Sequence, residues 1–285
     1  MTTKHATELL SGERFAFGSN WANFLRVLND ARIAEAEQSL RRMLNVDHLH
    51  GKRVLDIGSG SGLFSLAARR LGATVHSFDY DPESVACTTE LRRRNDPMDD
   101  GWVVESGSVL DAEYLRTLGT WDVVYSWGVL HHTGAMWEAL NNVSQLVAPE
   151  GLLFISIYND QQGLSVWWRW LKRTYNRLPR LLRTPYALAV LGPHEVMRFL
   201  RTTARSRDPR VYFVGISQYA ARSKRGMSYW HDLIDWIGGY PFEVATPEAI
   251  FDFCAARGFE MVKLKTCGGG LGCNEFVFRR SAAHD

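Results

Sequence analysis

Short apolar segments alternate with helix-like segments from residue 53 to residue 159, and this alternation constrains the fold more than any other feature. Five apolar runs predict strands, at residues 53–59, 74–80, 102–110, 121–130 and 151–159. The segments between them that predict helices are 63–72, 82–94 and 136–147. Strands and helices that alternate at this spacing form a parallel sheet, and right-handed crossovers place helices on both of its faces.

The alternation stops after residue 159 and returns near the C-terminus. Residues 161–240 are rich in Trp, Tyr, Arg and Leu, and amphipathic patterns predict two helices there, at 165–182 and 192–207. A helix at 246–258 and two strands joined by the turn CGGGLGC follow, the strands at 259–266 and 274–280. We therefore expect an α/β fold with a seven-stranded, mostly parallel sheet, an antiparallel C-terminal hairpin and a helical insertion after strand five.

The same pattern suggests how the chain is organised. Helical spacing over 20–46 predicts one or two helices, so residues 1–50 form an N-terminal helical segment. Residues 51–160 and 241–285 form the α/β domain that carries the glycine turn described below. Residues 161–240 are the insertion.

Composition and charge indicate in which compartment the protein works and which kinds of partner it binds. Charged residues make up 22% of the chain, no apolar run approaches the ~20 residues of a membrane span, and the N-terminus has no signal-peptide core. Four cysteines fit a reducing compartment, so we expect a cytoplasmic protein. The net charge is +2, but residues 161–225 carry +12 and the rest of the chain carries −10. Such a basic block indicates either an anionic partner or surface, or a solvated helical face.

The stretch VLDIGSGSG, residues 54–62, places a glycine turn directly after the first predicted strand. Gly58, Gly60 and Gly62 form G-x-G-x-G, whereas the dinucleotide fingerprint G-x-G-x-x-G needs its third glycine one position later. Asp56 precedes the turn, and a carboxylate there would repel a pyrophosphate but suits a cationic ligand. Asp79 ends the second predicted strand, where an acid can accept hydrogen bonds from both hydroxyls of a ribose.

These residues, with FDYD, GSVL and WDVVYSWGVLHH, resemble a class I S-adenosylmethionine-dependent methyltransferase, over residues 52–160 and again over 245–280. The likeness is greatest to the small-molecule methylases of ubiquinone and menaquinone pathways. It implies a Rossmann-like fold and S-adenosylmethionine as the cofactor. The turn residues Gly58, Ser59, Gly60 and Gly62, with Asp56, would then bind its methionine part, and Trp127 would approach the same part.

The resemblance also implies how the nucleoside part is held. Asp79 would bind the ribose, and Tyr80 would lie on the adenine ring. Ser108 and Val109 match the turn that meets the adenine edge. Ser108 stands where many members of the family have Asp, so Asp111 is a candidate substitute.

Two groups of histidines are candidates for catalysis. His131 and His132 follow the fourth predicted strand, and ligands in this kind of fold lie beyond the carboxyl ends of the strands. Either could act as a general base, or could instead cap a helix or pack beneath the loop. His231 and Asp235, four residues apart among aromatic side chains, could share a helix face and orient an imidazole, or lie on a wet helix face.

The expected function is methyl transfer to a small-molecule or lipid-linked acceptor, with a hydroxyl oxygen as the first choice and nitrogen as the second. A tRNA-modifying methyl or carboxymethyl transferase is the alternative enzyme, because SWGVLHH also resembles the tRNA wobble-uridine carboxymethyl transferases. A cofactor-binding scaffold without activity is the third alternative. We expect an anionic acceptor or peripheral membrane contact through 161–225, and rank nucleic acid lower because no RNA-binding signature is present. No metal site is expected, since the two cysteines of CGGGLGC lack further soft ligands.

Overall fold

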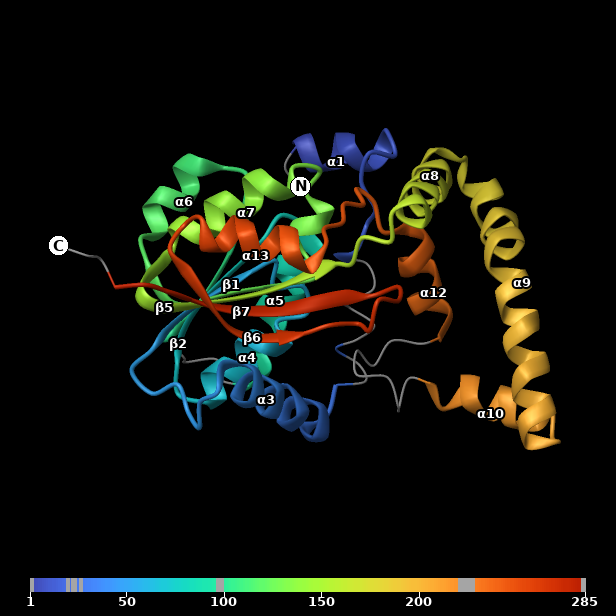
Figure 1. Ribbon diagram of the computed structural model, residues 1–285, viewed down its shortest axis with the longest axis horizontal. Coiled ribbons are helices and arrows are strands. Elements are labelled where there is room, and N and C mark those ends of the chain that lie inside the picture. Colours follow the sequence, from blue (N-terminus) through green and yellow to red (C-terminus); the bar gives the residue numbers. More distant parts are fainter. Residues whose placement is uncertain are drawn as a thin grey trace.

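The computed structural model describes residues 3–18, 21, 25, 28–95, 100–219 and 229–282. Its centre is a seven-stranded sheet in the order β3-β2-β1-β4-β5-β7-β6 (Figure 1). The first five strands in the chain run parallel, and β7 runs antiparallel to both β5 and β6. The predicted α/β fold with a closing antiparallel hairpin is therefore confirmed. The strands are β1 (Arg53–Ile57), β2 (Thr74–Asp79), β3 (Trp102–Ser106), β4 (Trp121–Trp127), β5 (Val147–Tyr158), β6 (Phe259–Lys265) and β7 (Cys273–Arg280).

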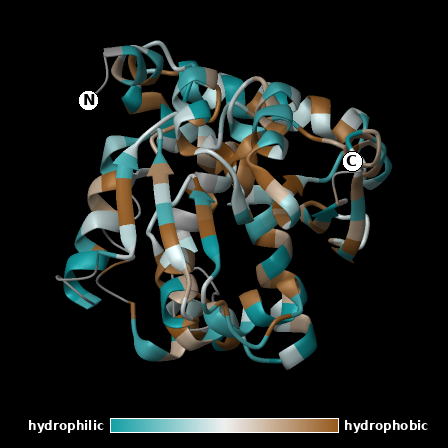
Figure 2. Cartoon of the chain, turned by 90° about the vertical axis from the view of Figure 1, so that its left-hand side faces the viewer, coloured by the Kyte–Doolittle hydropathy of each residue, from teal (hydrophilic) through white to brown (hydrophobic). Residues whose placement is uncertain are grey.

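Helices cover both faces of the sheet. One face carries α3 (Asp30–Leu44), α4 (Leu63–Arg70) and α5 (Pro82–Asn95). The other carries α6 (Ala112–Leu118), α7 (Met136–Gln145) and α13 (Pro247–Ala255). In Figure 2 the central strands carry long hydrophobic stretches, whereas the surrounding helices are striped with hydrophobic and hydrophilic residues. Both patterns fit a sheet that is buried on its two faces by amphipathic helices.

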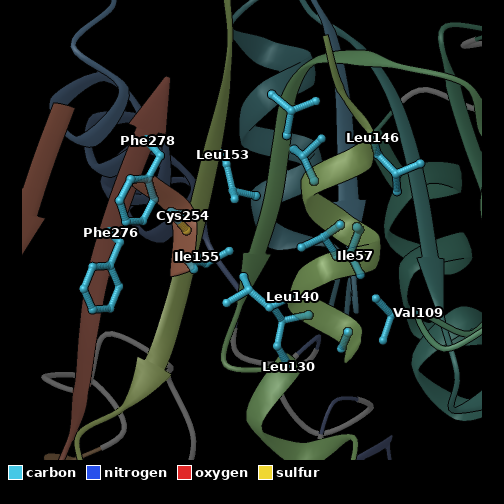
Figure 3. Packing of buried hydrophobic residues seen from close by; sticks show 14 of the residues in the cluster. Ile57, Val109, Leu130, Leu140, Leu146, Leu153, Ile155, Cys254, Phe276 and Phe278 are labelled. Carbon is cyan, nitrogen blue, oxygen red and sulfur yellow. The ribbon is translucent and has the colours of Figure 1, made fainter. Parts of the chain in front are cut away.

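The core beneath α7 is packed from elements that are far apart in the sequence. Leu140 of α7 and Leu153 of β5 are fully buried, and Phe276 and Phe278 stack on β7 with ring centroids 6.0 Å apart (Figure 3). Apolar burial of this kind stabilises the fold by about 25 cal/mol per Å². The antiparallel pair at the end of the chain is thus part of the main core.

The insertion differs from the prediction in where its helices begin and end. It contains α8 (Gly163–Arg177), α9 (Arg180–Ser206), α10 (Arg210–Ser217) and α12 (Tyr229–Gly238). The first predicted helix ends early, at Arg177, because Leu178 precedes Pro179 and takes an extended conformation. The second predicted helix begins before its predicted start and forms one 27-residue helix that includes Pro185 and Pro193. In Figure 1 this helix, α9, stands at the edge of the molecule away from the sheet.

The N-terminal segment contains a helix that the sequence pattern did not predict. This helix, α1 (Thr3–Leu10), lies above the sheet in Figure 1. The helical prediction over 20–46 is confirmed for α3, which begins after its N-cap Asn29 and ends at the left-handed Asn45. Part of the predicted stretch before residue 28 lies outside the described residues.

Asp56 occupies the opposite face of β1 from Ile57, since side chains alternate along a strand. With Val54 it faces the side covered by α3 and α4, and its carboxylate is 3% exposed. The Ser65 hydroxyl of α4 donates a hydrogen bond to it, and Ser65 in turn bonds Ser77 at 2.7 Å. The expectation that this carboxylate faces a cationic ligand therefore differs from the geometry, which places Asp56 in a buried polar network between β1 and α4.

Burial raises the pKa of Asp56 from 3.8 to about 7, because the charged form loses its hydration; the Ser65 hydrogen bond opposes this rise and the nearby Asp79 adds to it. A carboxyl whose pKa is higher in the folded than in the unfolded protein destabilises the fold as the pH rises from about 4 through 7. Asp56→Asn cannot ionise at this position. We therefore expect its free energy of unfolding, relative to that of the parent, to rise by about 2 kcal/mol from pH 5 to pH 8. Urea denaturation at both pH values measures this, and a difference between the two proteins that does not change with pH would contradict it.

Candidate active site

A cavity of about 380 Å³ opens at the carboxyl ends of β1, β2 and β4. The crossovers from β1 and from β4 leave in opposite directions there, and such a switch point is where open α/β sheets bind ligands. The lining comes from the glycine turn, the ends of β2 and β4, the loops at 107–110 and 128–135, and the N-terminal segment. The lining residues are Lys4, His5, Glu8, Arg14, Phe15, Phe17, Trp21, Ile57, Gly58, Gly60, Phe78, Asp79, Tyr80, Asp81, Ser84, Gly107, Ser108, Val109, Leu110, Trp127, Gly128, Val129, His132, Thr133, Gly134 and Ala135.

The glycine turn needs residues without a side chain. Gly58 has a φ of +77°, and a Cβ built on it would lie 2.4 Å from Cγ2 of Val129. Gly60 has a φ of +56°, and its Cβ would lie 3.1 Å from the Trp21 ring. Both conformations are in the left-handed region that favours glycine, and both positions bring bare backbone to the cavity wall.

Ser59 and Gly62 shape the turn from outside the cavity. The Ser59 hydroxyl lies 3.0 Å from the Thr88 hydroxyl of α5, and Thr88 also donates to the Gly60 carbonyl at 3.2 Å. A Cβ on Gly62 would meet Cγ2 of Thr88 at 2.9 Å. Neither Ser59 nor Gly62 lines the cavity, so both contribute to its shape only through the turn that they position.

Asp79 brings a carboxylate to the cavity. Its two oxygens accept the N–H groups of Gly60 and Asp81, each at 2.9 Å. Burial raises the pKa of Asp79 from 3.8 to about 6, and these backbone donors oppose the rise. Each carboxylate oxygen has a further lone pair, so the group can still accept hydrogen bonds from ligand hydroxyls. Tyr80 lines the cavity next to it, with the Arg14 guanidinium 4.8 Å from the centre of its ring.

Ser108, Val109 and Trp127 all line the cavity, as their predicted roles require. Asp111, the candidate substitute for Ser108, does not line it. Its carboxylate instead caps the N-terminus of α6 by accepting the N–H groups of Glu113 and Tyr114, each at 3.1 Å. The turn therefore presents Ser108, and not Asp111, to a ligand.

The structure separates the roles of the two adjacent histidines, which lie in the short 3₁₀ helix Leu130–His132. His132 lines the cavity, and its Nδ1 lies 2.6 Å from the Pro241 carbonyl oxygen. A carbonyl only accepts, so Nδ1 carries the proton and the neutral ring has its lone pair on Nε2. His131 is 1% exposed, does not line the cavity, and accepts the Tyr158 N–H at its Nδ1.

The other predicted pair, His231 and Asp235, lies on α12, and its arrangement stays a prediction. Both backbones lie in α12, but the two side chains fall outside what the structure describes. None of the described insertion residues, 161–219 and 229–240, lines the cavity. In the described part of the chain, no three His, Cys, Asp or Glu side chains gather closely enough to hold a metal ion.

Sequence reasoning missed the N-terminal segment, which closes one side of the cavity. Phe15 donates its N–H to the Tyr240 carbonyl at 2.9 Å, and Gly18 donates to the Asp81 carboxylate at 2.8 Å. The only signal in the sequence is the aromatic spacing in RFAFGSNW, residues 14–21, which has no helical or strand period.

Arg14 of this segment contacts cavity residues that follow β2 and β4. Its guanidinium donates to the His132 carbonyl at 3.1 Å and to the Glu8 carboxylate at 2.8 Å, and it also lies over Tyr80. The Phe17 ring lies 4.9 Å from the His132 ring. The N-terminal segment thus contacts the loop after β2 and the loop after β4 at once.

Comparisons with known proteins agree with this geometry. A family model described as methyltransferase domain matches residues 28–264. The ubiquinone biosynthesis O-methyltransferase of Xanthomonas campestris pv. campestris (strain B100) is 32% identical over 152 residues, 53% of each chain. The protein of the same name from Burkholderia cenocepacia is 31% identical over 163 residues, 54% of this chain and 60% of that one. The chain thus spans little more than half the length of these curated relatives.

Solved structures show the same fold at low sequence identity. Magnesium protoporphyrin IX methyltransferase from Synechocystis PCC 6803, with bound SAH, superposes with a TM-score of 0.51 at 14% identity, over 89% of each chain. An O-methyltransferase family protein from Burkholderia thailandensis gives a TM-score of 0.50 at 16% identity, over 98% of this chain and 68% of that one. The family model covers most of the chain, and the chain belongs to the class I S-adenosylmethionine-dependent methyltransferases.

Proposed function

We propose that the protein transfers a methyl group from S-adenosylmethionine to a hydroxyl oxygen of a small-molecule or lipid-linked acceptor, with His132 as the general base. The observation that carries this proposal is the placement of His132, a histidine on the cavity wall whose Nδ1 proton is held by the Pro241 carbonyl. The relatives named as ubiquinone biosynthesis O-methyltransferases support oxygen as the acceptor atom.

The residues of the cavity fit S-adenosylmethionine. Bare backbone at Gly58 and Gly60 permits close approach of the methionine part, and Trp127 lies at the end of β4 beside it. The Asp79 carboxylate accepts hydrogen bonds from the ribose hydroxyls, and Tyr80 and Val109 provide apolar surface for the adenine. Bound S-adenosylmethionine supplies a methyl group that is already activated by the positive charge on its sulfur.

A hydroxyl acceptor must lose its proton, and His132 is the general base that takes it. The Pro241 carbonyl fixes the tautomer and the orientation of the ring, so Nε2 is the atom that takes the proton. His131, packed against Tyr158 with ring centroids 4.1 Å apart, supports the loop from beneath. His132 is therefore the base, and His131 is a positioning residue.

The insertion offers a surface for membrane contact, which we include in the proposal. No helix in the described residues is long and apolar enough to cross a membrane. Of the 27 residues of α9, all of which the structure describes, Leu191 alone is buried. On α8, Trp167 and Trp170 are 49% and 59% exposed beside several arginines. Exposed aromatic and basic side chains together favour the anionic inner leaflet, from which a cytoplasmic enzyme could take a lipid-linked acceptor.

Asp79→Asn is expected to weaken binding of S-adenosylhomocysteine by about 1–3 kcal/mol, because an amide accepts at one atom only and carries no charge. Isothermal titration calorimetry measures this change. Asp111→Asn is the matched control, since it also removes one carboxylate but keeps a helix-capping side chain outside the cavity. Unchanged affinity in Asp79→Asn, or an equal loss in both variants, would remove Asp79 from the ribose site.

His132→Asn tests the base and the reaction together. The Asn amide can still donate to the Pro241 carbonyl but cannot take a proton, so kcat is expected to fall about 100-fold or more while cofactor affinity changes little. Formation of S-adenosylhomocysteine and methylated product is followed by mass spectrometry with catechol and geranyl-substituted catechol as acceptors. The decline of kcat/KM at acid pH that a histidine base causes should be absent from the variant.

Three results would contradict this assignment. Equal kinetics in parent and His132→Asn would exclude His132 as the base. Cofactor binding without turnover on any acceptor would indicate a non-catalytic scaffold. Methylation of added total tRNA in preference to either catechol would replace the acceptor class.

The membrane contact is tested by co-sedimentation with vesicles. The protein is expected to bind phosphatidylglycerol vesicles more tightly than phosphatidylcholine vesicles, and less tightly as salt is raised. The double variant Trp167→Ser, Trp170→Ser should lower binding to anionic vesicles about tenfold. Trp137→Ser is the control, because Trp137 is similarly exposed but lies on α7. Equal binding to both kinds of vesicle, or equal loss in the control, would reject the proposed surface.

A further inference from the structure

His5 of α1 lies on the cavity wall although it belongs to none of the family motifs. It is 1% exposed and lines the cavity together with Asp79, Tyr80 and Asp81. Its ring meets the Tyr80 ring edge to face, with centroids 5.3 Å apart. The N-terminal helix therefore places an imidazole opposite the end of β2, where the proposed function puts the nucleoside half of the cofactor.

Neither ring nitrogen of His5 has a hydrogen-bond partner among the residues that the structure describes. The nearest acidic atom is Oδ2 of Asp81, 4.0 Å from Nε2, which is beyond hydrogen-bond distance. The Asp81 oxygens already accept the N–H groups of Gly18 and Glu83, at 2.8 and 2.9 Å. Asp81 is thus engaged with backbone N–H groups, and among the described residues no hydrogen bond offsets the burial of the imidazole.

Buried polar groups in folded proteins are almost always hydrogen-bonded, so an unpaired imidazole on a cavity wall indicates a partner that enters the cavity. A neutral imidazole offers one donor and one acceptor. The ribose hydroxyls can donate and accept, and the adenine ring nitrogens can accept, so the nucleoside matches either tautomer. The amino-acid half of the cofactor is expected at the bare backbone of Gly58 and Gly60.

We propose that His5 is a cofactor-binding residue that hydrogen-bonds the nucleoside half of S-adenosylmethionine and holds α1 over the site. This inference rests on the proposed function, since it assigns a residue to the same cofactor. It adds a contact from a part of the chain that carries no sequence motif. The edge-to-face packing on Tyr80 orients the ring, and the ligand completes its hydrogen bonding.

The test compares His5→Phe with the parent protein, because phenylalanine keeps an aromatic ring against Tyr80 and removes both nitrogens. Calorimetry with S-adenosylhomocysteine and with 5′-methylthioadenosine, which lacks the amino-acid part, should show the same loss of affinity, about tenfold for each probe. Thr7→Ala, an exposed position on the same helix, should bind both probes like the parent.

Two further measurements separate a hydrogen bond from a packing effect. The thermal unfolding midpoint of ligand-free His5→Phe should equal or exceed that of the parent, because the variant buries no unpaired nitrogen. His5→Asn and His5→Gln place an amide near the Nδ1 and Nε2 positions, and at least one of them should bind more tightly than His5→Phe. Equal weakness in all three variants would overturn the hydrogen-bond assignment.

The remaining outcomes are distinct from a failure of the proposed function. Affinities of His5→Phe within twofold of the parent would overturn the inference, as would a loss seen only with S-adenosylhomocysteine. If the parent itself bound neither probe, the proposed function would fail first, before any comparison of variants.

Discussion

The Asp79 carboxylate joins two turns of the site, and the rest of the cavity depends on this junction. One oxygen accepts the Gly60 N–H of the turn after β1, and the other accepts the Asp81 N–H of the turn after β2. Partial removal from solvent raises the pKa of Asp79, and the two backbone donors offset part of that rise. An apolar side chain at this position would leave both N–H groups without this acceptor, so the shape of the turn and the negative charge on this part of the cavity wall come from one residue.

The sheet and the place of several cavity-lining residues could be predicted from the sequence because both follow from local patterns. Strand and helix alternation determines a parallel sheet, and the end of β2 then places Asp79 and Tyr80 at the carboxyl edge beside the glycine turn. The same reasoning expected Asp56 to face a cationic ligand, whereas its side chain lies in a buried polar network with Ser65. Its position in the chain was correct, but the period of two along β1 turns its side chain toward Ser65 and α4, and only the packing of the helices determines which face holds the cavity.

The N-terminal segment could not be predicted because its contacts are long-range and follow no period. Arg14 and Phe17 line the cavity, and the segment that carries them is held by hydrogen bonds to residues more than sixty positions away, Gly18 to Asp81 and Phe15 to Tyr240. The helix limits in the insertion failed for a different reason. The amphipathic pattern of the first predicted helix continues past Pro179, where α8 has already ended, whereas Pro185 and Pro193 interrupt the pattern but lie within α9.

The insertion is connected to the proposed base through residues 240–243, at and just after its end, since none of its described residues lines the cavity. Tyr240 and Pro241 offer their carbonyls to Phe15 and to the His132 ring. Glu243 donates its N–H to the His131 carbonyl, and its carboxylate accepts the N–H of Met136 at the start of α7.

Helix α8 also contacts residues 240–243. The Arg169 guanidinium donates to the Phe242 carbonyl at 3.1 Å, and Phe242 packs in one cluster with Trp168 and Leu171 of α8. The helix that we propose to meet the membrane is therefore bonded to the segment that orients the proposed base. Arg169 of α8 and the His132 ring thus contact the carbonyl oxygens of adjacent residues, Phe242 and Pro241.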